Sequence, residues 1–258
     1  MRFCSLGSGS SGNATLVEAS SGTTRTRVLI DCGFSMRELE ARLVRAGAAS
    51  DLIDAIFVTH EHGDHIGCAI SLARRRHIPL WMSRGTWRAI GEPDLPELLH
   101  FARDGEPFAV GDLEISPFTV PHDALEPLQL RCSDGASSLG VLTDVGSITP
   151  HLLAHLRACE ALLLECNHDR DLLAASAYPA SLKARIGGRY GHLANDLSAA
   201  ILSACLHDGL QHLVAAHLSE RNNRPALARE ALTAICGGAA SDIVVADPLT
   251  GFDWLTIV

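Results

Sequence analysis

Three histidines and two acidic residues stand within the seven-residue run Thr59-His60-Glu61-His62-Gly63-Asp64-His65. Imidazole nitrogens and carboxylate oxygens are ligands suited to zinc or a similar divalent ion. In an extended segment His60 and His62 point to the same side, so both can bind one ion. Asp64 and His65 follow the turn at Gly63 and point elsewhere, which suits a second ion. The alternative to a metal site is a solvated histidine-rich loop without a specific ligand. It is disfavoured because clustered imidazoles repel one another when protonated.

Polar residues able to bind a metal or a proton also recur where short apolar runs end. In chain order they are Asp31, the run beginning at His60, His122, Asp144, Glu165 followed by His168, and His217. Ligand sites in α/β proteins lie at strand ends, where loops converge on a rigid scaffold. We therefore expect these side chains to meet at one edge of a sheet.

The elements that must position these residues are short strands alternating with helices. Strands are predicted at Val28–Ile30, Ala55–Val58, Leu113–Val120, Leu139–Thr143, Ala161–Leu164 and His212–Ala216. Helices are predicted at Met36–Ala46, Ile66–His77, Pro150–Ala158, Asp196–Leu206 and Ala226–Ile235. This alternation indicates an α/β class protein with sheets covered by helices. Since neither a repeat nor a Pro/Gly-rich linker divides the sequence, residues 1–258 are expected to form a single domain.

The composition excludes several classes of protein. Of the 258 residues 47% are apolar, which is too many for an intrinsically disordered chain. No apolar run approaches eighteen residues, and the Ser/Gly-rich start does not resemble a secretory signal. Eight cysteines are scattered singly, as in proteins of a reducing compartment. We expect a soluble cytoplasmic protein without a membrane partner.

The formal net charge of −9, from 21 basic and 30 acidic residues, argues against broad electrostatic binding of nucleic acid. Bound divalent ions would offset this charge locally, because they are often the largest charges in a site. The acidic balance therefore weakens a nucleic-acid function without excluding it.

The central run resembles the signature of the metallo-β-lactamase-fold hydrolases. Five further segments are similar to the WalJ/YycJ-type branch of that superfamily, which is associated with 5′-to-3′ exonuclease activity on DNA. They are Phe3–Asn13, Val120–Ala124, Thr143–Gly146, Leu164–Asp169 and Gly191–Leu193. The resemblance runs from the first residues to about Asn223 and includes no β-CASP insertion.

The resemblance implies a four-layer αββα sandwich with two divalent metal ions, zinc or manganese, at one edge of its sheets. It assigns His60, His62 and His122 to the first ion. It assigns Asp64, His65 and His217 to the second ion, with Asp144 bridging both. Asp31 would orient a ligand imidazole, and His192 would be the general acid, so that Asp31, Asp64 and His192 all serve catalysis. Two carboxylates neutralise half of the metal charge, and the remainder favours an anionic substrate.

Further residues near these positions are candidates for binding substrate. A basic stretch contains Lys183, Arg185 and Arg189, and phosphate neutralisation explains its placement beside His192, although a solvated face is nearly as good an explanation. Backbone amides of the loop that holds Ser11 and Asn13 could cradle a terminal phosphate. His168 could contact a phosphate oxygen, or simply make hydrogen bonds within its loop. Asn195, at the start of a predicted helix, completes the candidates.

The sequence thus favours a two-metal phosphodiesterase, with a DNA exonuclease acting on phosphate-bearing ends of DNA (or RNA) as the preferred hypothesis. One alternative is hydrolysis of a cyclic phosphodiester, thioester or lactone, because the same fold and metals support several chemistries. A non-catalytic metal-binding protein is the other. The basic residues near His192 favour phosphate substrates, and the full ligand set disfavours a non-catalytic role.

Overall fold

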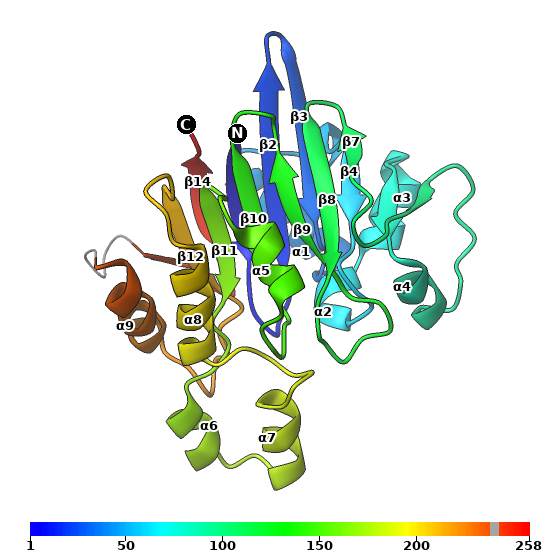
Figure 1. Cartoon of the computed structure of the whole chain (residues 1–258). Helices are drawn as coiled ribbons and strands as arrows, with labels where there is room; N and C mark the ends of the chain where they lie inside the picture. The colour runs from blue at the N-terminus through cyan, green and yellow to red at the C-terminus, as the bar shows by residue number, and fades with distance from the viewer. Residues whose placement is uncertain (238–242) are drawn as a thin grey trace.

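Two mixed β-sheets form the centre of the molecule in the computed structural model, which describes residues 1–237 and 243–258 (Figure 1). The first sheet has the strand order β14 (Phe252–Thr256), β1 (Arg2–Gly7), β2 (Ala14–Ser21), β3 (Thr24–Ile30), β4 (Ala55–Phe57), β5 (Leu80–Met82), β6 (Leu99–Phe101). The second has the order β13 (Val244–Val245), β12 (His212–Ala216), β11 (Ala161–Glu165), β10 (Ser138–Leu142), β9 (Leu128–Ser133), β8 (Leu113–Thr119), β7 (Phe108–Val110). An apolar core that includes Phe3, Phe57 and Leu130 fills the space between the sheets.

Helices cover the outer face of each sheet. The first sheet carries α1 (Met36–Arg45), a 3₁₀ turn (Ser50–Leu52), α2 (Gly63–Ile66), α3 (Ala69–Arg76) and α4 (Arg84–Ala89). The second carries α5 (Pro150–Leu156), α8 (Asn195–Cys205) and α9 (Pro225–Cys236). Two more helices, α6 (Arg170–Ala175) and α7 (Ala180–Ile186), project from the lower edge of the sandwich in Figure 1. The architecture is therefore the four-layer αββα sandwich, and the predicted fold class is confirmed.

The predicted strands and helices are present with ends shifted by a few residues. The helix predicted over Ile66–His77 begins later than expected, because α3 starts only at Ala69 and Ile66 ends the separate helix α2. Gly67 lies between the two helices with a φ of 30°. A Cβ at this position would lie 2.2 Å from the carbonyl oxygen of Cys32, so the close approach of the two chain segments requires glycine. This contact holds the histidine-bearing loop against the end of β3.

The directions of the strands gather the polar strand ends at one edge. Strands β3 and β4 are parallel, and so are β10, β11 and β12, so their carboxyl ends share an edge within each sheet. A hydrogen bond from Gly146 N to Pro121 O, 2.7 Å long, holds the end of β8 beside the segment after β10. The helices α6 and α7 lie at this same edge (Figure 1).

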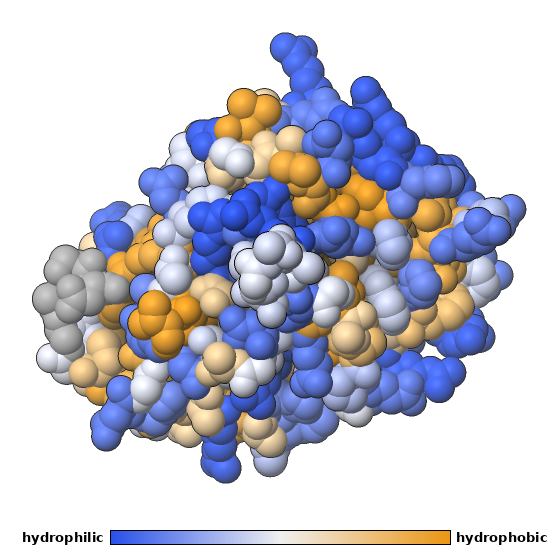
Figure 2. All heavy atoms as spheres, turned by 90° about the horizontal axis from the view of Figure 1, so that it is seen from above, coloured by the Kyte–Doolittle hydropathy of each residue, from blue (hydrophilic) through white to orange (hydrophobic). Residues whose placement is uncertain are grey.

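The opposite end of the sandwich, seen from above, shows polar residues interspersed with apolar ones (Figure 2). Within the described parts of the chain, no helix combines the length and the apolar character that crossing a bilayer requires.

Candidate metal centre

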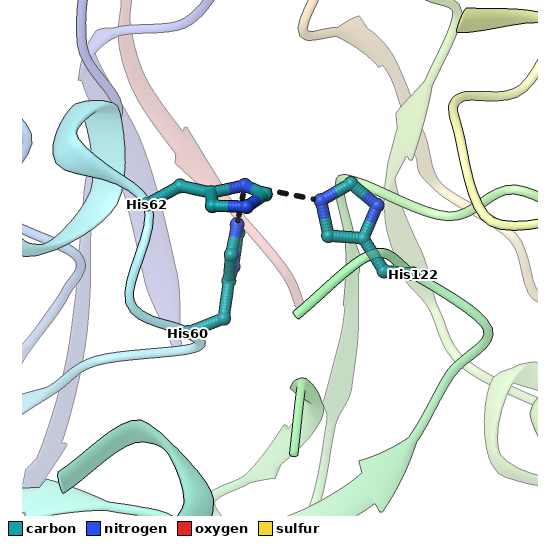
Figure 3. Close-up of side chains that lie close together, drawn as sticks. All are labelled: His60, His62 and His122. Atoms are coloured by element: carbon teal, nitrogen blue, oxygen red, sulfur yellow. Dashed lines mark hydrogen bonds between the residues drawn. The ribbon is translucent and has the colours of Figure 1, made fainter. Parts of the chain in front are cut away.

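His60, His62 and His122 form the first donor set, with their rings directed at one another (Figure 3). Nδ1 of His62 lies 3.1 Å from Nε2 of His60 and 3.3 Å from Nε2 of His122. Nδ1 of His122 donates to the carbonyl oxygen of Gly191 at 3.0 Å, which leaves Nε2 of that ring as the acceptor nitrogen. The three nitrogens therefore converge on one point.

This convergence matches the demands of a tetrahedral ion. Zinc binds imidazole nitrogen at about 2.0–2.1 Å, which separates neighbouring ligand nitrogens by roughly 3.3 Å. Burial lowers the pKa of His60 well below its usual value and also lowers the pKa of His122. Both rings are thus neutral near pH 7 and present lone pairs instead of protons. The first donor set fits a borderline divalent ion.

The second donor set, Asp64, His65 and His217, lies beside the first. Oδ2 of Asp64 is 3.6 Å from Nε2 of His65 and 3.7 Å from Nε2 of His217. The two imidazoles are almost completely buried, whereas Asp64 is half-buried at the start of α2. Two nitrogens and one oxygen are again a donor combination that zinc or manganese accepts.

Asp144 stands between the two sets. Its Oδ2 contacts Nε2 of His65 and lies 3.6 Å from Nε2 of His60, and its Oδ1 lies 2.8 Å from Nδ1 of His217. Although Asp144 is only 1% exposed, neither of its oxygens has a partner with hydrogen-bond geometry among the described residues. A buried carboxylate without donors needs positive charge close by. The environment of Asp144 therefore fits a bridge between two cations.

Without metal, protons on the imidazoles meet this need for positive charge. Burial alone would lower the pKa of His65, but Asp144 and Asp31 outweigh it and raise the pKa to about 10. Burial would likewise lower the pKa of His217, but the charge of Asp144 outweighs burial and raises this pKa well above its usual value. A bound divalent ion would replace these protons, so metal binding at this centre releases protons.

Asp31 follows β3 and orients His65 from behind. Its Oδ2 lies 2.7 Å from Nδ1 of His65, and its Oδ1 accepts from the backbone N–H of Thr59 at 2.8 Å. The interaction directs Nε2 of His65 toward Asp64 and Asp144. This is the arrangement in which a carboxylate fixes the tautomer of a metal-binding imidazole.

Asp31→Asn is expected to lower the affinity for divalent metal by about 10- to 100-fold, because it removes the charge behind His65 and preserves the shape of the side chain. Titration of the metal-free protein with zinc measures the change. Asp112→Asn, between β7 and β8, is the control and should bind zinc like the wild type, since the Asp112 carboxylate accepts from the hydroxyls of Thr24 and Thr26 on β3. Equal zinc affinity for Asp31→Asn and the wild type would contradict this role.

Three residues of the centre have left-handed backbone conformations that side chains other than glycine rarely adopt. The φ angles are 62° for Asp31, 55° for Asp144 and 53° for His217. Asp31 and His217 directly follow β3 and β12, and Asp144 lies two residues after the end of β10. Backbone strain of this kind gathers at functional sites, where the surrounding structure enforces it. Here it turns each side chain inward at the edge of its sheet.

His192 lies next to the centre, and Glu165 at the end of β11 holds it. Nδ1 of His192 is 2.8 Å from Oε1 of Glu165 and 3.0 Å from Oδ1 of Asp144. Glu165 is fully buried, and its Oε2 accepts from the backbone N–H groups of Val145 and Leu193. Burial would lower the pKa of His192, but Glu165 and Asp144 raise it to about 9. Glu165 was expected at this edge as a polar residue at the end of an apolar strand, and no catalytic or metal-binding role was predicted for it.

A cavity of about 410 Å³ opens over the two donor sets. His62, Asp64, Asp144, His192 and His217 belong to its lining. Sequence analysis did not single out several other residues that line it: Ser10, Asp123, Asn167, Tyr178, Leu182, Ile186, Ser219 and Asn222. Ser10, Asp123 and Asn167 belong to segments that carry the family resemblance. No sequence pattern marks the others, which come from α7, the segment before it and the loop after β12.

Among the predicted basic residues, only Arg185 lines the cavity. Its Nε donates to Oδ2 of Asp123 at 2.6 Å, and its side chain is 65% exposed. Nζ of Lys183 instead donates to the carbonyl oxygen of Ala174, and the guanidinium of Arg189 lies over the ring of Tyr190. Of the three, Arg185 alone is therefore placed to meet a substrate in the cavity.

The other predicted substrate residues lie around the cavity in supporting positions. Asn13 is buried, and its Nδ2 donates to the carbonyl oxygen of Asp64 at 3.2 Å. Ser11 donates to Glu220 at the surface. The side chain of Asn195 pairs with that of Asn223 through two amide hydrogen bonds. His168 is 1% exposed, and burial lowers its pKa to about 4. The contacts of Ser11, Asn13 and Asn195 therefore join loops around the cavity, whereas Nδ1 of His168 is buried and has no hydrogen-bond partner among the described residues.

Comparison with known proteins identifies the family. A sequence model described as the beta-lactamase superfamily domain matches residues 26–217. A Bacillus anthracis protein named exodeoxyribonuclease YycJ is 33% identical over 91% of this chain and 89% of its own length. Exodeoxyribonuclease WalJ of Streptococcus pneumoniae is 32% identical over 88% of this chain and 85% of its own length. The chain belongs to the beta-lactamase superfamily, in its YycJ/WalJ branch.

Solved structures share the fold of this superfamily member at low sequence identity. The metallo-β-lactamase-fold protein YhfI from Bacillus subtilis superimposes with a TM-score of 0.74 at 17% identity, covering 99% of both chains. Zinc-bound PqqB from Methylobacterium extorquens gives a TM-score of 0.73 at 16% identity, over 99% of this chain and 100% of that one. The chain is a metallo-β-lactamase-fold hydrolase, and its fold and donor sets imply divalent metal ions.

Proposed function

We propose that this chain is a two-metal phosphodiesterase that removes nucleotides from the 5′ ends of DNA. The observation that carries the proposal is the shared cavity, in which two donor sets linked by Asp144 lie beside His192. The substrate class and the exonuclease activity come from the names of two relatives. The match with this chain covers most of the length of each relative. We further infer that residues 1–258 act in the cytoplasm as one unit.

The two donor sets would hold zinc or manganese, the first through three imidazoles and the second through Asp64, His65 and His217. When bound, two divalent ions activate water and neutralise charge on the phosphoryl group. The remaining contributions come from the chain itself. Asp144 keeps the two sites in a fixed relation, and Asp31 keeps His65 aligned.

His192 is placed to donate a proton to the oxygen that leaves. Glu165 and Asp144 both face Nδ1, so Nε2 is the nitrogen available to a substrate in the cavity. Departure of a sugar oxygen from phosphorus requires a proton, and a positioned imidazole supplies it. Arg185, at the rim of the same cavity, can pair with a phosphate next to the scissile one.

The local charge of the cavity accounts for binding of an anionic substrate by an acidic protein. Its carboxylates, Asp64, Asp123 and Asp144, all face imidazoles or Arg185. Adding two divalent ions makes this region cationic although the chain carries a net charge of −9. Association with DNA should therefore depend on this one region and weaken as salt increases.

A nuclease assay with defined ends tests the proposal. DNA labelled at the 3′ end, with either a 5′-phosphate or a 5′-hydroxyl, is incubated with protein loaded with zinc or manganese. We expect stepwise shortening from the 5′-phosphate end, which stops when a chelator is added. Asp144→Asn, purified in parallel, is the control for a contaminating nuclease. Rapid turnover of a thioester, lactone or cyclic phosphodiester without cleavage of nucleic acid would replace this proposal, and no hydrolysis of any substrate would reject it.

A further inference from the structure

Helix α7 has an apolar face that does not pack into the core of the protein. None of its seven residues is buried. Leu182 and Ile186, four residues apart and hence on the same face of the helix, both line the cavity over the donor sets. Apolar faces of helices in globular proteins normally pack against a core. This one faces the space where the substrate binds.

Tyr178, just before α7, extends the same apolar wall. It is half-buried and lines the cavity. The guanidinium of Arg221, from the loop after β12, lies 5.8 Å from the centre of its ring. Aromatic rings in nucleic-acid-binding sites provide platforms on which bases stack, because every base has a flat apolar face. Tyr178, Leu182 and Ile186 thus form an apolar wall of the same cavity that holds residues of the donor sets as its floor, and the ring offers such a platform.

Asn222 provides a second, independent indication of a ligand. Its side chain is 1% exposed and belongs to the lining of the cavity. Nδ2 donates to Oγ of Ser219 at 3.3 Å, but Oδ1 is buried and has no partner among the residues that the structure describes. Buried polar atoms are nearly always hydrogen-bonded in native proteins, so an unpaired one in a cavity marks a position for a ligand donor.

The size of the cavity limits what can occupy this wall. Its volume of about 410 Å³ lies at the lower end of the range for small-molecule sites. One nucleotide is compatible with that volume, whereas a stacked end of a duplex is not. Phosphate on the floor and a base on the wall would fill the cavity from the metal donors to α7.

We propose that the cavity is a subsite for a single unpaired nucleotide, with its base stacked on Tyr178 and an N–H group of the same base donating to Oδ1 of Asn222. The inference rests on the proposed function for its substrate class. It adds that the terminal base must leave its partner strand before cleavage. Single-stranded or frayed ends should therefore enter the subsite more readily than stacked blunt ends, because unstacking opposes entry.

Binding of small probes tests the subsite without relying on activity. Deoxyadenosine 5′-monophosphate and deoxyribose 5-phosphate, which lacks the base, are titrated into zinc-loaded protein by calorimetry. The wild type should bind the nucleotide about 5- to 150-fold more tightly than the sugar phosphate, the range for stacking of one base. Tyr178→Ala should lose most of this preference, Tyr178→Phe should keep it, and Asn222→Ala should weaken nucleotide binding alone. Tyr190→Ala, which removes a 52% exposed ring outside the cavity, should behave like the wild type.

Kinetics on DNA provide the second readout. A 5′-phosphorylated single strand is compared with the same strand carrying an abasic terminal residue. The wild type should prefer the intact strand through a lower KM, and Tyr178→Ala should treat the two strands alike. An unchanged preference in Tyr178→Ala, in both binding and kinetics, would overturn the subsite. The protein could also bind the nucleotide more tightly than the sugar phosphate, in a way that depends on Tyr178, and yet cleave no DNA. That result would support the subsite and reject the proposed function.

Discussion

Asp144→Asn is expected to reduce metal binding at both donor sets and to lower kcat/KM by at least about 10³-fold. The substitution keeps the shape of the side chain and suits the left-handed backbone, because asparagine tolerates positive φ. It removes the negative charge that lies between His65, His60 and His217. Stabilisation of transition-state charge by metal is worth several kcal/mol, and each 1.4 kcal/mol corresponds to a factor of ten. Elemental analysis and steady-state kinetics measure the two effects.

His122→Ala provides the matched comparison, because His122 belongs to the first donor set alone. It should weaken one ion preferentially, whereas Asp144→Asn should weaken both. Asp196→Asn, which removes a surface carboxylate paired with Arg170, should leave metal content and activity unchanged. Full retention of two ions by Asp144→Asn, or no more than one ion in fully loaded wild type, would refute the binuclear arrangement.

His192→Ala is expected to keep its metal and fold normally but to lose about 10²- to 10⁴-fold in kcat on DNA. This is the contribution typical of a general acid. A p-nitrophenyl phosphodiester has a leaving group that needs little protonation, so the variant should lose far less activity on that substrate. The ratio of the two losses separates proton donation from positioning, because a positioning defect affects both substrates alike.

His151→Ala is the control for removal of a histidine, since His151 is exposed and pairs with Asp104 away from the cavity. It should match the wild type on both substrates. Equal losses on DNA and on the aryl ester for His192→Ala would assign His192 to binding of phosphate. Loss of metal from the variant would identify His192 as a metal ligand. Its position next to Asp144, the candidate bridging carboxylate, would be compatible with that role.

The gathering of the candidate metal donors could be predicted because metal-binding chemistry leaves a local pattern in the sequence. His60, His62, Asp64 and His65 stand within six residues, and no common structural requirement places such groups together. Asp144 and His217 could be located because each follows an apolar strand, and parallel strands bring their ends to one edge. The four-layer architecture came from the family resemblance, and the alternation of strands and helices indicated the class alone.

The wall of the cavity could not be predicted, because it depends on how α7 is oriented. Lys183 and Arg185 are two positions apart, which is about 200° around a helix, so only one of them can face the cavity. The sequence shows a basic stretch and does not show which side faces the metal donors. Tyr178 and Asn222 come from different loops, and only the tertiary structure makes them neighbours.

The left-handed conformations of Asp31, Asp144 and His217 create a conflict between selection for thermal stability and selection for catalytic activity. Each such residue stores about 1–3 kcal/mol of backbone strain that glycine would release. Glycine at one of these positions would also leave buried partners of Asp31, Asp144 or His217 unpaired. Directed evolution for heat resistance alone should therefore favour glycine only where all three side chains are replaced together, which yields an inactive protein. A library screened for both properties should hold all three residues fixed and gain its stability elsewhere on the scaffold.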